Sequence, residues 1–185
     1  MPSAFTHAFA AASMASLVAP GRGKLIALAA IAATLPDADA LAFRLGIPYE
    51  SMLGHRGLTH SVAFAACFAA LTTWALVRSA RTEVSAARLG TMLLLAMVSH
   101  GVLDAMTNGG LGVAFFAPFS GERFFFPWRP ILVSPIALRR FFSPRGLVVL
   151  ANEARVVWVP FALLWIGGSL FRYAQSKLAR KNRPR

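Results

Sequence analysis

The chain has 185 residues, of which 57% are hydrophobic and 14% charged, and its formal net charge is +12. Soluble domains carry roughly 25% charged residues. A protein of this size could not cover so much apolar surface in water, so the composition excludes an ordinary soluble domain and favours a membrane protein. The length allows one domain. We expect that domain over residues 1–173 and a basic tail over 174–185.

Five apolar segments follow one another along the chain, at about residues 4–18, 24–35, 59–77, 87–106 and 156–173. A spanning helix needs about 20 residues, with a range of about 17–25, so the last three segments are long enough. The first two predict a short hairpin that crosses only in part. The stretch 107–155, rich in Phe, Pro and Arg, predicts an irregular interfacial loop. The sequence therefore predicts an all-α, multi-pass helical membrane protein with about five apolar helices.

Basic residues are distributed unequally over this topology. If all five segments cross, the N-terminus and the loops 36–58 and 107–155 share one face. The other face carries all three lysines and eleven basic residues in total, against eight arginines on the first. By the positive-inside rule the tail is cytoplasmic. In a bacterium the first face would then lie on the periplasmic side of the inner membrane.

Every histidine and every aspartate lies in one of four short clusters on the first face. They are His7, Asp37 and Asp39 in LPDADAL, His55 and His60 in HRGLTHS, and His100 and Asp104 in SHGVLDAMTNGG. Imidazole with carboxylate suits zinc, manganese or iron better than calcium or magnesium. The sequence predicts a metal site of these seven residues, with zinc as the first choice and manganese as the alternative. They are too many for one tetrahedral zinc, so two ions, or one ion and a general base, would use them all.

Each cluster also has a structural explanation. His100 and Asp104 lie one turn apart on one helix face, where a simple His–Asp hydrogen bond would also relieve the cost of burial. The two carboxylates of LPDADAL could bridge ions or cap a helix. In HRGLTHS a tight turn at Gly57 would let both histidines point at one centre, whereas an interfacial loop would leave them solvated. His7 is a candidate ligand only because it lies on the same face as the other clusters.

Several neighbours could support such a site. Arg56 could pair with a phosphate or carboxylate and stabilise developing negative charge. Thr107, Asn108 and the pair Gly109–Gly110 predict a helix stop whose backbone could approach a substrate. Three glutamates lie on this face: Glu50, Glu122 and Glu153. Any of them could be a further ligand or general base, but single glutamates at an interface are usually solvated, and this is the expectation here.

The order of these motifs resembles a known family. A histidine near the N-terminus, PDxD, HRGxTHS and SHxxxDxxT are similar to the LexA-binding, inner membrane-associated metal-dependent hydrolases (YdjM-like). The resemblance extends from His7 through the FFFPWRP and SP motifs. The family's pattern often has a histidine directly after PDxD, where this chain has Ala40. The family is distantly similar to helical zinc phospholipases C and nucleases, which implies phosphoester chemistry.

We therefore expect a membrane-bound hydrolase that acts on a lipid or lipid-linked phosphoester through a metal-activated water. Asp39, Arg56 and His60 would carry the catalytic roles. The alternative is a non-catalytic protein that binds or transports metal, but ligands gathered at one face favour hydrolysis. The expected partners are membrane lipids and a phosphoester substrate. The net charge of +12 suits orientation and anionic lipids rather than a specific nucleic acid. The oligomeric state is left open.

Overall fold

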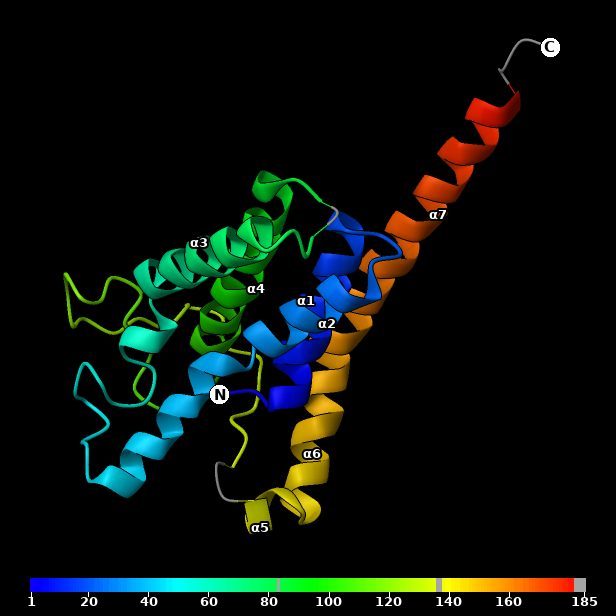
Figure 1. Cartoon of the computed structure of the whole chain (residues 1–185). Coiled ribbons are helices and arrows are strands. Elements are labelled where there is room, and N and C mark those ends of the chain that lie inside the picture. Colours follow the sequence, from blue (N-terminus) through cyan, green and yellow to red (C-terminus); the bar gives the residue numbers. More distant parts are fainter. Residues whose placement is uncertain (83, 136–137, 182–185) are drawn as a thin grey trace.

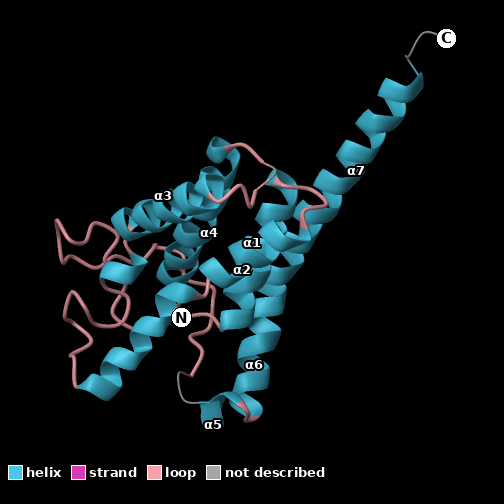
Figure 2. Ribbon diagram, viewed as in Figure 1, coloured by secondary structure: helices cyan, strands magenta, loops and turns pink. Residues whose placement is uncertain are grey.

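Alanine- and leucine-rich runs form the helices of this protein in a computed structural model, which describes residues 1–82, 84–135 and 138–181. The principal helices are α1 (Ala4–Val18), α2 (Gly23–Ala32), α3 (Val62–Arg78), α4 (Ala86–Ala105) and α7 (Val159–Lys181). The shorter ones are η1 (Leu35–Leu45), η2 (Leu58–His60), α5 (Leu138–Phe141), α6 (Pro144–Glu153) and η3 (Ala154–Trp158). Loops join them, and the described residues contain no strand (Figure 2).

Local signals set the helix boundaries. The Ser61 side chain accepts a hydrogen bond of 3.0 Å from the backbone N–H of Phe64 and so caps α3. Ser85 caps α4 in the same way. Pro144 stands in the first turn of α6, where a missing N–H costs nothing. α6 continues through the π-helical turn η3 into α7, so the two form one long helical element.

The first helix lies in the middle of the bundle. α1 contacts α2, α4 and α7, and α3 packs on α4. In Figure 1, α7 runs along one edge and its C-terminal part extends beyond the other helices. Small side chains fill much of the core and let the helices approach closely; they include Ala11, Ala15, Ala29, Ala65, Ala69 and Ala96.

The loops lie at opposite ends of the bundle, as the alternating topology requires. The start of α1, the η1–η2 segment and the chain after α4 gather at one end (Figure 1). The α1–α2 turn, the α3–α4 connection and the C-terminus lie at the other end. The clusters of ionisable residues therefore come from segments that share an end.

The expected fold class is confirmed. Three helical stretches are long and apolar enough to cross a membrane: Gly23–Leu45, Ala86–Ala105 and Pro144–Ala179. The apolar helices Ala4–Val18 and Val62–Arg78 are shorter. The second of these begins at Val62, where Ser61 caps it, and its 17 residues lie at the lower limit of the spanning range of about 17–25.

Two further boundaries differ from the expectation. The second apolar segment does not end at Pro36 but continues through η1 to Leu45, because a proline is tolerated in the first turn of a helix. The stretch 107–155 was expected to be irregular, and this is wrong from Leu138 onward, where the short helix α5 is followed by α6. Residues 174–181 of the expected basic tail continue α7, and residues 182–185 lie outside the described residues.

Candidate metal centre

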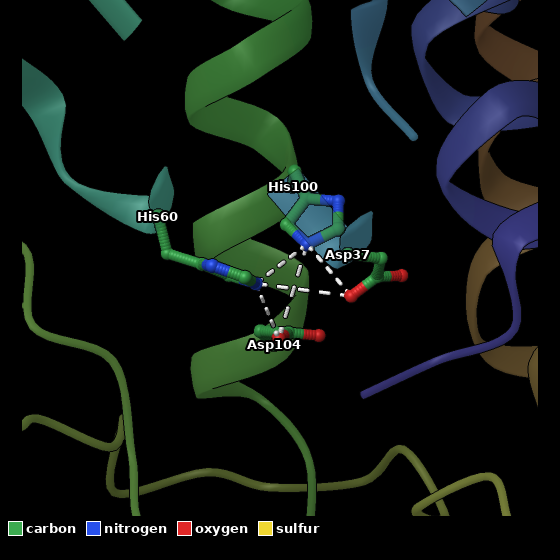
Figure 3. A group of neighbouring side chains, drawn as sticks. All are labelled: Asp37, His60, His100 and Asp104. Carbon is green, nitrogen blue, oxygen red and sulfur yellow. Dashed lines mark hydrogen bonds and ion pairs between the residues drawn. The ribbon is translucent and has the colours of Figure 1, made fainter. Parts of the chain in front are cut away.

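Four side chains from three segments converge where α4 ends. Asp37 comes from η1, His60 from η2, and the other two, His100 and Asp104, from α4 (Figure 3). Each offers one ligand atom, and these atoms lie within 4.8 Å of one another. We refer to these four residues as the α4 cluster.

The atom spacings match a cation site. The Nε2 atoms of His60 and His100 are 2.9 Å apart. Asp37 Oδ1 lies 3.4 Å from His100 Nε2 and 3.8 Å from His60 Nε2. Asp104 Oδ2 lies 3.4 Å from His60 Nε2 and 4.0 Å from His100 Nε2. Ligand atoms around a tetrahedral zinc ion, with bonds of about 2.0–2.1 Å, are about 3.3 Å apart. The α4 cluster is therefore of the right size.

Outer hydrogen bonds fix the tautomers of both histidines. Nδ1 of His100 lies 2.7 Å from the carbonyl oxygen of Ala33, which can only accept, so this nitrogen carries the proton. Nδ1 of His60 lies 3.0 Å from Thr59 Oγ1. The Thr59 hydroxyl donates its own proton to Asp39 Oδ2 at 2.6 Å, so its oxygen accepts from Nδ1, which also lies 3.1 Å from Asp39 Oδ2. Each Nε2 is left with a lone pair that faces the carboxylate oxygens of the α4 cluster. Four electron-pair donors aimed at one point repel each other unless a cation or proton lies between them.

The buried oxygens and nitrogens of this region are incompletely paired. Among the described residues, both carboxylate oxygens of Asp37 and Asp104 and both ring nitrogens of His7 lack a hydrogen-bond partner. A buried polar group left in this way costs about 1–3 kcal/mol. His7 stacks on His100 with ring centroids 3.7 Å apart, and its Nε2 lies 3.5 Å from Asp104 Oδ1. The nitrogen and oxygen donors are of the types that bind a transition-metal ion. A bound ion would also give a partner to the carboxylate oxygens that lack one.

The charge of the region points the same way. Three aspartates gather around one buried guanidinium, that of Arg56, so carboxylates outnumber it while the imidazoles are neutral. Burial alone would lower the pKa of His60, but hydrogen bonds with Asp104, Asp37 and Asp39 outweigh burial and raise the pKa to about 10. The three carboxylates therefore favour a positive charge at His60. That charge can be a proton on the ring or a metal ion bound in place of the proton.

A second group adjoins the α4 cluster. Ligand atoms of Asp39, His55 and His60 also lie within 4.8 Å of one another, so the two groups share His60. Asp39 Oδ1 lies 2.6 Å from His55 Nδ1. The seven residues expected to bind metal thus divide into the four of the α4 cluster, two behind His60, and His7 beside His100.

Arg56 lies at the centre of the turn that presents both HRGLTHS histidines. Its side chain is fully buried, with Nε 3.0 Å from Asp104 Oδ2. Its terminal nitrogens donate to the Gly109 carbonyl and to Thr107 Oγ1, each at 3.0 Å. Its backbone φ of 63° lies in the left-handed region, a conformation that costs a non-glycine residue about 1–3 kcal/mol. Gly57 is required for space, because a Cβ there would lie 2.1 Å from the Met52 carbonyl oxygen.

One residue of this end was assigned wrongly from the sequence. Glu153 was expected to be solvated but is fully buried. Its carboxylate accepts hydrogen bonds from the backbone and hydroxyl of Ser3 and from the Thr6 hydroxyl, and Trp158 Nε1 donates to Thr6 Oγ1 at 2.7 Å. This network ties α6 and η3 to the turn that carries His7. Its partners are about 150 positions away in sequence, so no local pattern could reveal it.

Comparison with known proteins identifies a matching family and a similar protein. The profile of a family described as YdjM inner membrane protein matches residues 1–178. The chain is also 40% identical over 168 residues to the inner membrane protein YbcI of Escherichia coli (strain K12), an alignment that covers 89% of this chain and 95% of YbcI. No solved structure matches it significantly. The resemblance inferred from the motifs is confirmed, and an inner-membrane location agrees with the apolar helices.

Proposed function

This chain belongs to the YdjM inner membrane protein family, and we propose that it is a membrane-bound, metal-dependent hydrolase of phosphoesters. One observation carries the proposal. Two imidazole nitrogens and two carboxylates point at one place, and each imidazole is held there by a hydrogen bond at its other nitrogen. Catalytic zinc sites are built from such donors.

The α4 cluster would hold the ion, and its nitrogen and oxygen donors suit zinc first and manganese second. A bound divalent ion would supply Lewis acidity towards a phosphoryl oxygen and would activate water for attack. His7 lies beside the cluster, and among the described residues neither of its ring nitrogens has a hydrogen-bond partner, so it could accept the proton of an attacking water. Arg56 places a fixed positive charge next to Asp104, where it would stabilise negative charge that develops on the substrate.

The surroundings favour a lipid or lipid-linked substrate. An apolar groove of about 510 Å³ lies between α4, the start of α3 and the aromatic loop; it is lined by Val62, Val98, Val102, Phe115, Phe116 and Phe124–Phe126. The groove adjoins the turn of α4 that carries the ligands: a Cβ on Gly101 would lie 3.1 Å from both the Phe115 ring and the His60 carbonyl oxygen. A hydrocarbon chain could therefore lie in the groove with its phosphate near the α4 cluster.

The distribution of basic residues supports an orientation in which the metal centre faces the periplasm and the C-terminal tail the cytoplasm. Arg22, Lys24 and Arg81 line a pocket between the α1–α2 turn and the α3–α4 connection, at the end opposite the centre. Alkaline phosphatase fused to the tail is expected to be inactive and a fluorescent-protein fusion bright. The reverse result would invert the proposed orientation.

A non-catalytic metal-binding or transport protein is the second candidate. The side chains of His60, His100 and Asp104 are fully buried, and that of Asp37 is only 10% exposed. Closed sites of this kind are typical of structural rather than catalytic ions. The gathering of all ligands at one end of the bundle, instead of along a path through it, is our reason for preferring hydrolysis.

Elemental analysis combined with an activity assay decides between the candidates. We expect the purified wild type to contain zinc or manganese and to hydrolyse bis-p-nitrophenyl phosphate or a phospholipid, and His60→Ala to lose both properties. Glu122→Gln, an exposed carboxylate outside the site, is the control. Metal without hydrolysis would favour the second candidate, and well-folded wild type that takes up no metal would contradict both.

A further inference from the structure

Asp39 makes all its recorded contacts with the HRGLTHS turn and none with the α4 cluster apart from His60. Its side chain is 4% exposed. Oδ1 lies 2.6 Å from His55 Nδ1. Oδ2 accepts hydrogen bonds from the Thr59 hydroxyl at 2.6 Å and the Arg56 backbone N–H at 3.1 Å, and it lies 3.1 Å from His60 Nδ1. This carboxylate is therefore almost saturated by donors from one turn.

Two roles are compatible with this position. Asp39, His55 and His60 could hold a second ion, since their ligand atoms are close enough. Alternatively, Asp39 could act on the first ion indirectly, through His60. The two roles can be distinguished at His60, which belongs to both groups. Only one nitrogen of a neutral imidazole has a lone pair, so the ring can bind one ion.

The contacts of His60 decide which nitrogen has that lone pair. Its Nε2 faces His100, Asp37 and Asp104 in the α4 cluster. A cation bound there leaves the proton on Nδ1, which lies 3.0 Å from Thr59 Oγ1 and 3.1 Å from Asp39 Oδ2. Because the Thr59 hydroxyl donates its own proton to Asp39, its oxygen accepts from Nδ1, and Thr59 joins Asp39 to His60. A second ion at Nδ1 would require a doubly deprotonated imidazole and would have to displace the hydrogen bonds that Asp39 accepts from Thr59 and Arg56.

We propose that Asp39 is a positioning residue that fixes the tautomer and orientation of His60, and that it is not itself a metal ligand. The inference rests on the metal centre proposed above. A hydrogen bond to the free N–H of a ligating histidine holds the ring in place and makes its other nitrogen a better donor. Asp39 provides this support through the Thr59 hydroxyl, which it orients. His55 supports Asp39 from the opposite side, and its carbonyl oxygen is held in turn by Arg123 at 2.9 Å.

Zinc binding by the intact, detergent-solubilised chain tests the proposal without any assay of activity. Stoichiometry is measured by elemental analysis and the Kd by competition with a chelator. We expect Asp39→Asn to bind as many zinc ions per chain as wild type but with a Kd about 10–100-fold higher. Asp37→Asn, which alters a ligand of the α4 cluster, should weaken binding more strongly. Glu50→Gln, an exposed carboxylate of the same loop, should match wild type.

Two results would overturn the proposal. If Asp39→Asn loses one ion per chain while the remaining ion keeps the wild-type Kd, Asp39 is a ligand of a second site. If its Kd equals that of Glu50→Gln, Asp39 does not act on the metal. Wild type that binds no zinc would instead refute the metal centre itself. Should Asp39→Asn fail to fold, Thr59→Ala removes the hydroxyl that joins Asp39 to His60 Nδ1 and is expected to raise the Kd about two- to tenfold; an unchanged Kd would again refute the proposal.

Discussion

Replacing Arg56 by lysine tests whether the buried guanidinium organises the metal-binding end. Lysine keeps the positive charge, but its single ammonium group cannot reach the three acceptors that Arg56 contacts, namely Asp104, Gly109 and Thr107. The ammonium could keep the ion pair with Asp104, but the two hydrogen bonds to Gly109 and Thr107 would be lost. Hydrogen bonds to charged groups contribute about 1.5–3 kcal/mol each, so the loss in the free energy of unfolding is about 3–6 kcal/mol. Arg56 is fully buried, so solvent does not screen this effect.

Thermal unfolding of the metal-free protein in one detergent measures this loss. For a chain of this size 1 kcal/mol corresponds to about 2–4 °C, so we expect Tm to fall by about 6–24 °C. Arg129→Lys is the matched control, because Arg129 is exposed and contacts only the face of the Phe125 ring, 4.9 Å from its centroid, among the interactions described. Its Tm should stay near that of wild type, since exposed substitutions change stability by about 0.5 kcal/mol or less. Equal Tm values for the two variants would refute the organising role of Arg56.

Three further predictions follow from single residues. Glu153→Gln should lower Tm by several degrees, because a neutral amide replaces a carboxylate that accepts a hydrogen bond of 2.6 Å from Thr6; an unchanged Tm would contradict the network. Gly57→Ala should prevent folding of the HRGLTHS turn, since the added Cβ would lie 2.1 Å from Met52 O, and loss of zinc binding would report it. In metal-free protein, His60 stabilises the fold fully below its ordinary pKa of 6.5, and this contribution disappears as the pH rises towards 10. Tm should therefore fall over that range in wild type more than in His60→Gln.

The parts of the site that could be predicted are those with a local signature. His100 and Asp104 share a helix face because they are four residues apart, and helix geometry fixes the rest. Counting the crossings was enough to place Asp37 and His60 at the same end, since each apolar segment reverses the direction of the chain. The sequence could thus indicate which residues meet, but not which of their atoms face one another.

The remaining details depend on tertiary contacts. The carbonyl of Ala33 sets the tautomer of His100, and backbone groups have no sequence signal. Asp37 and Asp39 look equivalent in LPDADAL, yet η1 turns one towards the α4 cluster and the other towards the HRGLTHS turn. From the sequence, Glu153 resembles a surface residue; its buried role becomes apparent only in the folded protein, where Ser3 donates a hydrogen bond to it. Distinguishing these roles requires the position of each donor and acceptor.

The bundle and its metal-binding end are stabilised by different means. Along the bundle, small residues such as Ala15, Ala29 and Ala69 pack in one apolar core. At the metal-binding end, buried carboxylates outnumber the buried guanidinium, and an apolar bundle cannot compensate that charge by itself. A proton on His60 compensates part of this negative charge, and a divalent cation would compensate more of it. The buried carboxylates that would bind an ion are thus the same groups that leave this end with uncompensated negative charge when no cation or proton is present.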